Sequence, residues 1–373
     1  MKRLCIILLI GCLLSISPVV AQGPHDLPPD VITSLQALID STVADPAVPG
    51  LVLWLDTPQG TFAGAGGLAD LEAGTPMQPD DALRIGSITK MFTATIVLQL
   101  MEEGALSLDD PLGRWLPNVA ERLPEGDRIT LRQLLNHTSG IYNYREDAYF
   151  RHMAALPAAA QNLDRVWEPR ELIDMALFHD PYFSPGAPGR WHYSNTNYTL
   201  LCMIIEAAGG TSVTEAYHRR IFEPLGLRHT YLADFEPPII PPVHGYTLQH
   251  GDLFDVTRWN ATESWCGGGL VSTAPDVITF AHALFSGALF SDAATLAEML
   301  DFVEPIGGMA YGLGVAREGR GIVGHFGNVP GFAAQLMAVP RSDRVAIYIA
   351  NTDSPPPALW AQLADAVRAL LNE

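Results

Sequence analysis

The chain has 373 residues, of which 48% are hydrophobic and 17% charged, and its formal net charge at pH 7 is −19. This balance excludes a disordered protein, and the length suits one large domain or two interleaved domains. The acidic surface that such a charge implies repels nucleic acid and anionic lipid headgroups, so neither is an expected partner.

The first 21 residues have the features of an export signal. Lys2 and Arg3 precede an apolar stretch, and small residues lead to a cleavage position after Ala21. Removal of residues 1–21 takes away two basic groups and changes the net charge from −19 to −21. We therefore expect an exported protein, periplasmic or extracellular. A lipoprotein stays open as the alternative, because Leu9-Ile10-Gly11-Cys12 resembles the bacterial lipoprotein box.

Two of the four cysteines, Cys5 and Cys12, lie within this leader. The other two, Cys202 and Cys266, are too few for a disulfide framework. We expect two unpaired, buried thiols, with a disulfide in an oxidising compartment as the alternative. No His or Cys cluster has metal-ligand spacing, so the sequence predicts neither a metal nor a cofactor.

The first predicted elements are a helix and a hairpin. Residues 31–45 place apolar side chains along one helical stripe. Two strands follow at Leu51–Asp56 and Thr61–Leu68, and Thr57-Pro58-Gln59-Gly60 between them predicts a hairpin turn. From Ser87 to about residue 235 the pattern is largely helical, interrupted by Pro- and Gly-rich loops.

Strand patterns return near the C-terminal end. The predicted strands are Ala310–Ala316, Gly321–His325, Phe332–Val339 and Arg344–Ala350. An amphipathic helix, Pro357–Leu371, closes the chain. Short turns between these strands predict antiparallel pairing.

Strands at both chain ends with a helical middle predict an α+β fold, in which helices flank one antiparallel sheet built from both termini. The sheet subdomain would take residues 31–86 and 240–373. A mostly helical subdomain, residues 87–239, would be inserted between these two parts.

The first segment with candidate catalytic residues is Arg84-Ile85-Gly86-Ser87-Ile88-Thr89-Lys90. A helix that begins near Ser87 and ends around Gly104 is apolar on nearly all sides, which predicts a central buried helix. Ser87 and Lys90 are three residues apart and therefore share one helical face. In a partly dry site, the pKa of a lysine amine can fall enough for it to accept a serine proton.

Two further segments supply groups that such a nucleophile needs. Tyr193 and Asn195 offer a phenol for proton transfer and an amide for substrate binding. Gly324-His325-Phe326-Gly327-Asn328 falls at a strand end, where the N–H of Asn328 would complete an oxyanion hole with that of Ser87. Each segment alone is more typical of a capped helix start, a turn or a hairpin end.

Together and in this order, the three segments resemble the signature of the serine β-lactamase and penicillin-binding family, which is S-x-x-K, then Y-x-N, then a K/H-T/S-G variant. The resemblance extends to residues 104–111, 129–140 and 267–273, and it covers most of residues 31–351. It is nearest to class C β-lactamases, D-alanyl-D-alanine carboxypeptidases and related esterases. No G-x-S-x-G elbow is present, so an α/β-hydrolase has no support.

The resemblance implies a β-lactamase/transpeptidase-like fold and an acyl-enzyme mechanism. It makes Ser87 the nucleophile and gives Lys90 and Tyr193 the acid–base steps. It also implies that Asn195 orients the substrate.

In the third segment, the resemblance implies that His325 stands where the family often has lysine and supports Tyr193 electrostatically. Gly327 and Asn328 would bind substrate beside it. By the same analogy, His137 has a structural role, as does its neighbour Ser139.

The third segment departs from the family pattern at Phe326. Members that bind a substrate carboxylate usually have a Thr or Ser hydroxyl there, and a Phe ring cannot donate a hydrogen bond. Carboxylate recognition would then come from elsewhere, with Arg317 and Arg320 as candidates. The change favours an esterase or amidase with an apolar substrate group, unless the ring points away from the cleft.

The sequence thus predicts an exported serine hydrolase that acts through a Ser87 acyl-enzyme on D-alanyl peptides or related amides and esters. A carboxylesterase and a class C-like β-lactamase stay open, so the small partner is a cell-wall D-alanyl peptide, an ester or a β-lactam. A non-enzymatic homologue that binds penicillin or peptidoglycan, or a scaffold, is the alternative from another class. The joint presence of Ser87, Lys90 and Tyr193 argues against it.

Overall fold

The computed structural model describes residues 27–156, 162–241, 243–304, 309–318 and 321–372. The predicted export signal with Cys12, and the candidate Arg320, lie outside these residues. Within the described ranges, no helix combines the length and apolar character needed to cross a bilayer.

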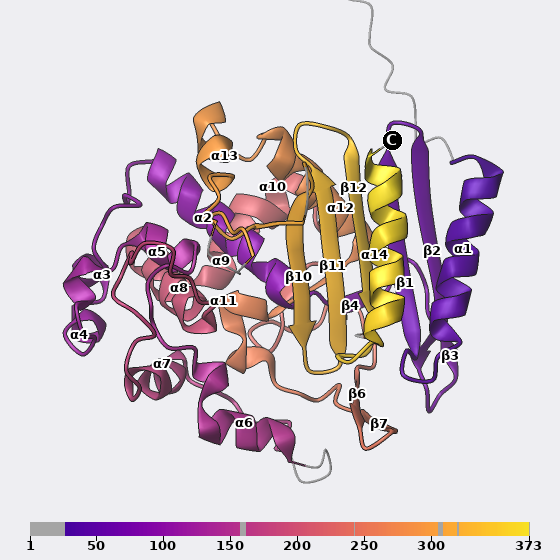
Figure 1. The fold of residues 1–373 in the computed structure, drawn as a ribbon, viewed down its shortest axis with the longest axis horizontal. Helices are drawn as coiled ribbons and strands as arrows, with labels where there is room; N and C mark the ends of the chain where they lie inside the picture. Colours follow the sequence, from indigo (N-terminus) through magenta and orange to yellow (C-terminus); the bar gives the residue numbers. More distant parts are fainter. Residues whose placement is uncertain (1–26, 157–161, 242, 305–308, 319–320, 373) are drawn as a thin grey trace, which may run out of the picture.

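A seven-stranded antiparallel sheet forms one half of the molecule (Figure 1). Its order is β3-β2-β1-β12-β11-β10-β9, so the two ends of the chain meet where β1 pairs with β12. The strands are β1 Gly50–Thr57, β2 Gly60–Asp70, β3 Thr75–Pro76, β9 Ala316–Arg317, β10 Val323–Val329, β11 Phe332–Val339 and β12 Arg344–Ala350. Thr57 pairs with Gly60, which confirms the predicted hairpin.

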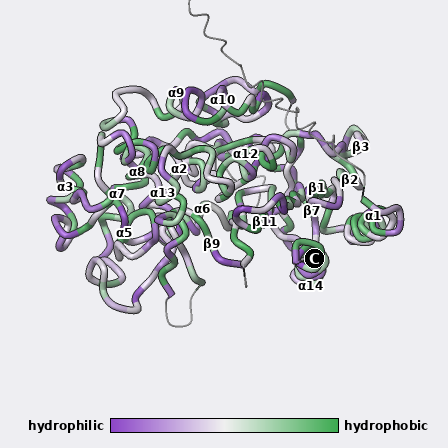
Figure 2. The backbone as a smooth tube through the Cα atoms, turned by 90° about the horizontal axis from the view of Figure 1, so that it is seen from above, coloured by the Kyte–Doolittle hydropathy of each residue, from purple (hydrophilic) through white to green (hydrophobic). Residues whose placement is uncertain are grey.

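Three helices cover the two faces of this sheet. They are α1 Pro29–Val43, α12 Ala274–Ser286 and α14 Pro357–Asn372. Side chains alternate along a strand, so Leu51, Leu53 and Leu55 pack with α1 and α14, whereas Val52 joins the larger core on the α12 face. Figure 2, which views the sheet along its edge, shows α12 on one side and α14 on the other.

The second half of the molecule is helical. Its helices are α2 Thr89–Glu102, α3 Leu112–Trp115, α4 Pro117–Ala120, α5 Leu131–Leu135, α6 Ala148–Ala155, α7 Pro169–Leu177, α8 Asn195–Gly209, α9 Val213–Tyr217 and α10 Glu223–Leu225. Short turns of other helix types are η1 Gly86–Ile88, η2 Gly126–Arg128, η3 Tyr144–Glu146 and η5 His218–Phe222. Nearly every residue of α2 is buried, which confirms the predicted central helix.

Smaller elements connect the halves. They are β4 Ala82–Arg84, β5 Tyr231–Leu232 and β8 Leu270–Thr273 in a three-stranded sheet, the hairpin of β6 Tyr246–Gln249 and β7 Asp252–Asp255, and the helices η6 Ala261–Glu263, α11 Trp265–Gly268 and α13 Ala293–Met299. The α+β prediction and the sheet drawn from both termini are therefore confirmed. The subdomain boundaries at residues 86 and 240 stay a prediction.

Two of the predicted strands differ from the structure. Ala310–Ala316 is not a strand, because Gly314 adopts a left-handed φ of +79° and only Ala316–Arg317 pairs with β10. The strand expected at Gly321–His325 begins at Val323 and continues to Val329. Helix α12 was not expected from the sequence. Its start nevertheless has a recognisable N-cap residue, Thr273, whose side chain accepts a hydrogen bond from Asp276 N–H.

Candidate active site

The segment 84–90, which contains Ser87, packs closely against β10 at two glycines, Gly86 and Gly327. A Cβ atom on Gly327 would lie 2.1 Å from the Ile85 carbonyl oxygen, and one on Gly86 would lie 2.8 Å from the Asn328 nitrogen. Gly86 also has a φ of +52°, which disfavours other residues. The sequence therefore allows η1, with Ser87, to pack directly against the end of β10.

Lys90 lies one helical turn beyond Ser87 and is fully buried. Its Nζ lies 3.1 Å from Ser87 Oγ, 2.8 Å from Asn195 Oδ1 and 2.5 Å from the Gly267 carbonyl oxygen. The last two partners can only accept hydrogen bonds. A neutral amine has two N–H groups and one lone pair, so these acceptors leave the lone pair directed at the Ser87 hydroxyl.

Electrostatics also favour the neutral amine. Burial lowers the pKa of Lys90 well below 10.5, the positive charge of Arg145 lowers it further, and the negative charge of Glu263 acts in the opposite direction. Lys90 therefore has the position that a base for Ser87 requires, and its lowered pKa favours the neutral form that accepts a proton.

Tyr193 lies on the other side of the lysine, with Lys90 Nζ 4.9 Å from the centre of its ring. Burial raises the pKa of Tyr193, and the nearby Ser87 hydroxyl counters that rise in part. The phenol oxygen is buried and forms no hydrogen bond with any described residue. The phenol is thus neutral and can donate to a reacting group.

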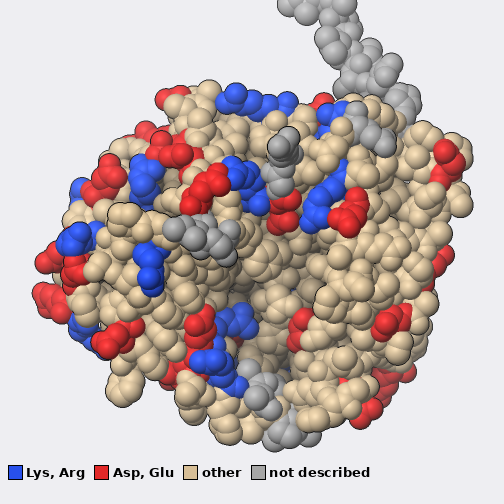
Figure 3. All heavy atoms as spheres, in the orientation of Figure 1, with Lys and Arg blue, Asp and Glu red and all other residues tan. Residues whose placement is uncertain are grey.

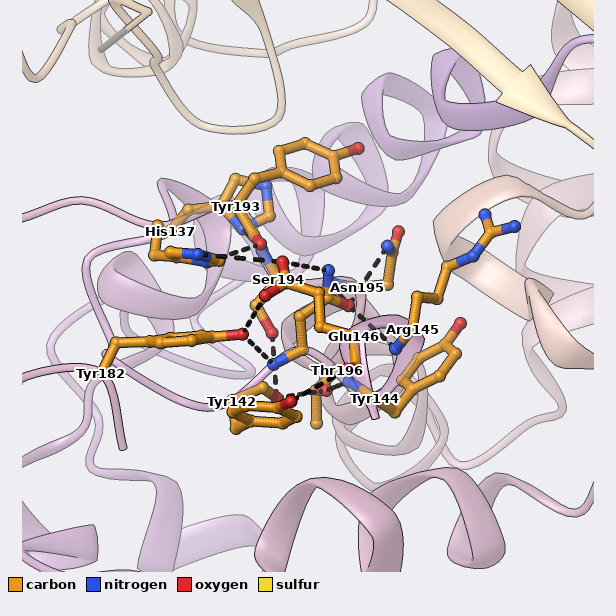
Figure 4. A network of polar contacts seen from close by, with 12 residues as sticks. His137, Tyr142, Tyr144, Arg145, Glu146, Tyr182, Tyr193, Ser194, Asn195 and Thr196 are labelled. Carbon is orange, nitrogen blue, oxygen red and sulfur yellow. Dashed lines mark hydrogen bonds and ion pairs between the residues drawn. The ribbon is translucent and has the colours of Figure 1, made fainter. Parts of the chain in front are cut away.

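His137 holds the loop that carries Tyr193 (Figure 4). Its Nδ1 accepts hydrogen bonds from Ser194 N–H at 3.2 Å and from the Asn197 side chain at 3.1 Å. Its ring centre lies 4.4 Å from that of Tyr193. Ser139 donates to the other end of the same Asn197 amide at 2.8 Å. These contacts are structural in kind, as the resemblance implied.

Asn143 orients Asn195, and sequence reasoning missed it. Its Oδ1 accepts from the backbone N–H of Asn195 at 3.2 Å and from the Asn195 amide at 3.4 Å. This arrangement turns Asn195 Oδ1 toward Lys90. No local pattern could have revealed it, because the two asparagines are 52 residues apart.

The loop around Asn143 rests on stacked aromatic rings. His179, Tyr142, Tyr182 and His192 stack in that order, with ring centres 4.0, 5.1 and 3.7 Å apart. Tyr182 also donates a hydrogen bond to Glu146 at 2.8 Å. The stack fixes η3 beside the catalytic residues.

A disulfide joins Cys202 to Cys266, so the expectation of unpaired thiols was wrong. Their Cα atoms are 6.0 Å apart, within the range of ordinary disulfides. Tertiary folding brings α8 against α11, which local sequence does not show. Cys202 lies in α8, the helix of Asn195, and Cys266 directly precedes Gly267 in α11. The disulfide therefore joins the two helices that provide the hydrogen-bond acceptors of Lys90.

His325 is buried on β10, with its ring centre 6.2 Å from that of Tyr193. Its Nδ1 donates to the Phe326 carbonyl oxygen at 2.6 Å, and its Nε2 accepts from the Tyr311 hydroxyl at 2.8 Å. Burial is the main cause that lowers the pKa of His325 to about 3, and any positive charge on Lys90 acts in the same direction. The ring is therefore neutral, and the electrostatic support of Tyr193 that the resemblance implies stays a prediction.

Phe326 and Asn328 point away from His325. Phe326 pairs across the strands with Gln335, while His325 pairs with Leu336 of the inner core. The Phe326 ring is 38% exposed, on the opposite face of the sheet from His325. Asn328 directs its amide to the Asp353 carbonyl oxygen at 2.7 Å. An oxyanion hole at Ser87 and Asn328 stays a prediction.

The described residues include no group of three or more His, Cys, Asp or Glu side chains arranged to hold a metal ion. Of the two arginines expected to recognise a carboxylate, Arg317 instead pairs with Glu304. Among the charged groups, Arg145 has the largest effect on the pKa of Lys90, and the sequence did not single it out.

A protein-family model described as Beta-lactamase matches residues 35–369. Among solved structures, a D-stereospecific amidohydrolase from Streptomyces sp. superposes with a TM-score of 0.81 and 33% identity, covering 90% of this chain and 98% of that one. The D-amino acid amidase from Ochrobactrum anthropi SV3, complexed with D-phenylalanine, gives a TM-score of 0.79 and 28% identity, covering 92% and 99%.

Among curated proteins, Penicillin-binding protein 4* from Bacillus subtilis (strain 168) is 27% identical over 311 residues. That match covers 77% of this chain and 64% of the relative. The chain thus spans less than two thirds of the length of this relative.

Proposed function

The chain belongs to the Beta-lactamase family, and from this premise we propose that it is an exported, D-stereospecific serine hydrolase. Its substrates would be amides or esters of D-amino acids, including D-alanyl peptides. Similarity to a D-stereospecific amidohydrolase along 90% of the chain supports the choice of D-configured substrates. The basic and apolar N-terminal residues support export.

The observation that carries the proposal is the set of contacts around Lys90. Asn195 Oδ1 and the Gly267 carbonyl occupy the N–H groups of the neutral amine, and Ser87 Oγ lies 3.1 Å from the same nitrogen. In acylation, Ser87 Oγ bonds to the substrate carbonyl carbon while its proton passes to Lys90 Nζ. A negatively charged oxygen forms, for which backbone N–H groups at Ser87 and Asn328 are the proposed donors.

Tyr193 completes the first half of the reaction. Its neutral phenol gives a proton to the departing nitrogen or oxygen as the bond to the carbonyl carbon breaks, and Lys90 returns a proton to the phenol oxygen. The acyl group stays on Ser87. Water then attacks the acyl carbonyl carbon and gives a proton to the same pair of residues. The bond from that carbon to Ser87 Oγ breaks, Oγ takes up the proton, and the acid is released.

The test compares enantiomers. The purified protein and its Ser87→Ala and Ser286→Ala variants are incubated with D- and L-phenylalanine amide and with the matching methyl esters. We expect the wild type and Ser286→Ala, which changes an exposed serine, to hydrolyse the D-substrates. Ser87→Ala should lose at least about 10⁴-fold in kcat. Equal activity on both enantiomers would contradict the D-stereospecificity.

The covalent step has its own readout. Intact-protein mass spectrometry with a penicillin should show an adduct on the wild type and none on Ser87→Ala. Hydrolysis without any dependence on Ser87 would overturn the catalytic assignment. A penicillin turned over faster than the amides would identify a β-lactamase instead.

A further inference from the structure

Arg145 places a guanidinium beside the catalytic residues without a close partner. It lies in η3, and its side chain is 27% exposed. Its one ion pair within the described residues joins Nη2 to Glu263 Oε1 at 3.7 Å, longer than a hydrogen bond. Figure 4 shows the side chain passing Asn195 and ending on the side away from His137.

Glu263 balances the charge of Arg145 but does not satisfy its donors. A guanidinium has five N–H groups in a fixed planar fork. Glu263 is fully buried, and its Oε1 already accepts the Ser264 hydroxyl. The N–H groups of Arg145 therefore remain free to bind a planar anion.

The charge of Arg145 acts on groups from both halves of the molecule. Burial is the main cause of the low pKa of Lys90, and Arg145 is the next. Burial alone would lower the pKa of Arg145, but Glu263 and, more weakly, Asp353 raise it overall. Lys90 belongs to the helical half, and Asp353 follows β12. Figure 3 shows a hollow bordered by charged side chains in this face of the molecule.

Three other basic side chains, Lys90, His325 and Arg317, already have hydrogen-bond or ion-pair partners. Lys90 holds Ser87, and His325 is neutral and bonded to Tyr311. Arg317 pairs with Glu304. Strand β10 supplies no hydroxyl, because Phe326 and Asn328 occupy the positions after His325. Arg145, whose guanidinium has no close hydrogen-bond partner among the described residues, thus has donors available for a ligand near the catalytic residues.

We propose that Arg145 is a specificity-determining residue that binds a carboxylate of the substrate. This inference rests on the proposed function and narrows it to D-amino-acid amides or peptides that carry a negative charge near the cleaved bond. A carboxylate matches the guanidinium fork with two parallel hydrogen bonds. The charge lies either on the leaving group or on the acyl part.

Two matched substrate pairs distinguish these positions. The first pair is acetyl-D-alanyl-D-alanine and acetyl-D-alanyl-D-alaninamide, which differ only in the leaving-group carboxylate. The second pair is succinyl-D-alanine p-nitroanilide and acetyl-D-alanine p-nitroanilide, which differ in the acyl part. In one of the two pairs, we expect the wild type to favour the carboxylate by about tenfold or more in kcat/KM, mainly through KM.

The variants separate recognition from folding. Arg145→Met should reduce that preference to about one while changing the neutral substrate much less. Because this variant leaves Glu263 buried and unpaired, Arg145→Met with Glu263→Gln removes both charges as a second version. Arg145→Lys, which keeps the charge but not the fork, should retain part of the preference. Arg317→Met, at an arginine with its own partner, is the matched control and should retain all of it.

Two outcomes would overturn the inference. The wild type could show no preference in either pair, or both Arg145→Met variants could lower the two members of a pair equally, as a purely structural ion pair would. The neutral substrates keep these results distinct from failure of the proposed function. If Ser87-dependent hydrolysis of the neutral members persists, then the role of Arg145 alone is refuted.

Discussion

The active site has two walls of different construction. The helical wall consists of Lys90, Asn195 and Gly267 from α2, α8 and α11. It is a buried network in which Lys90 Nζ contacts Ser87 Oγ, Asn195 Oδ1 and the Gly267 carbonyl oxygen. The strand wall consists of His325 to Asn328 on β10, where buried and exposed side chains alternate. In the proposed mechanism, the helical wall controls proton transfer, whereas the strand wall supplies shape, the predicted backbone donors and a neutral imidazole.

This difference has an energetic consequence. A buried neutral amine keeps its position only while its hydrogen-bond acceptors are held in place, and here the Cys202–Cys266 disulfide joins the two helices that carry or adjoin those acceptors. The edge of a strand needs no such support, since its backbone is fixed by the neighbouring strand. We therefore expect changes in the helical wall to have larger effects than changes in the strand wall.

The largest effect should come from Lys90→Met, which keeps the length of the side chain and removes the base. We expect kcat to fall about 10³-fold or more, because general base catalysis contributes on this scale. Steady-state hydrolysis of D-phenylalanine amide measures it. Activity near that of the wild type would show that Lys90 is not the base.

A direct titration supplies the control for this prediction. The chain contains lysine only at positions 2 and 90, so ¹⁵N-lysine labelling gives at most two side-chain signals. We expect the Lys90 signal to titrate well below pH 10.5, and activity to rise as pH increases through the same value, because only the neutral amine accepts a proton. Titration at an ordinary lysine pKa would remove the distinction between the walls.

The next effect concerns the staple of the helical wall. Loss of the Cys202–Cys266 bridge, which closes a loop of sequence separation 64, should lower the free energy of unfolding by about 2–5 kcal/mol. Denaturant unfolding of Cys202→Ala, Cys266→Ala and the double variant measures this. Paired cysteines predict that each single variant costs nearly as much as the double. Additive costs would show two independent thiols.

The smallest expected effect concerns the strand wall and is the contribution of His325 to the pH dependence of the free energy of unfolding. Its folded pKa is about 3, against an ordinary 6.5, so the unfolded chain binds a proton first as the pH falls. This contribution to stability is complete above pH 6.5. It is lost toward pH 3 by up to about 1.4 kcal/mol per pH unit.

Unfolding of the wild type and His325→Gln between pH 7 and 4 gives the readout. The difference in free energy of unfolding between the two should shrink as the pH falls. His229→Gln, at an exposed histidine, is the matched control. Parallel curves for the wild type and His325→Gln would mean that His325 has an ordinary pKa in the folded protein, so that the strand wall gains a positive charge as the pH falls below about 6.5.

The sequence by itself determined the elements whose signals are local. Alternating residues and tight turns defined β11 and β12 at their observed bounds, and apolar periodicity defined α14 to within one residue of its observed end. The spacing of Ser87 and Lys90 placed both on one helical face, since helix geometry depends only on neighbouring residues. The order of the three motifs then indicated the family and its fold.

Tertiary structure alone decided what surrounds these residues. The Asn143 contact, the Gly267 carbonyl and the disulfide each join segments more than 50 residues apart, so no local pattern encodes them. The sheet likewise set the direction of Phe326, since a strand's side chains choose a face only when the strand pairs. Burial lowered the pKa of Lys90 and of His325, because a pKa depends on the final environment of a group rather than on its neighbours in sequence.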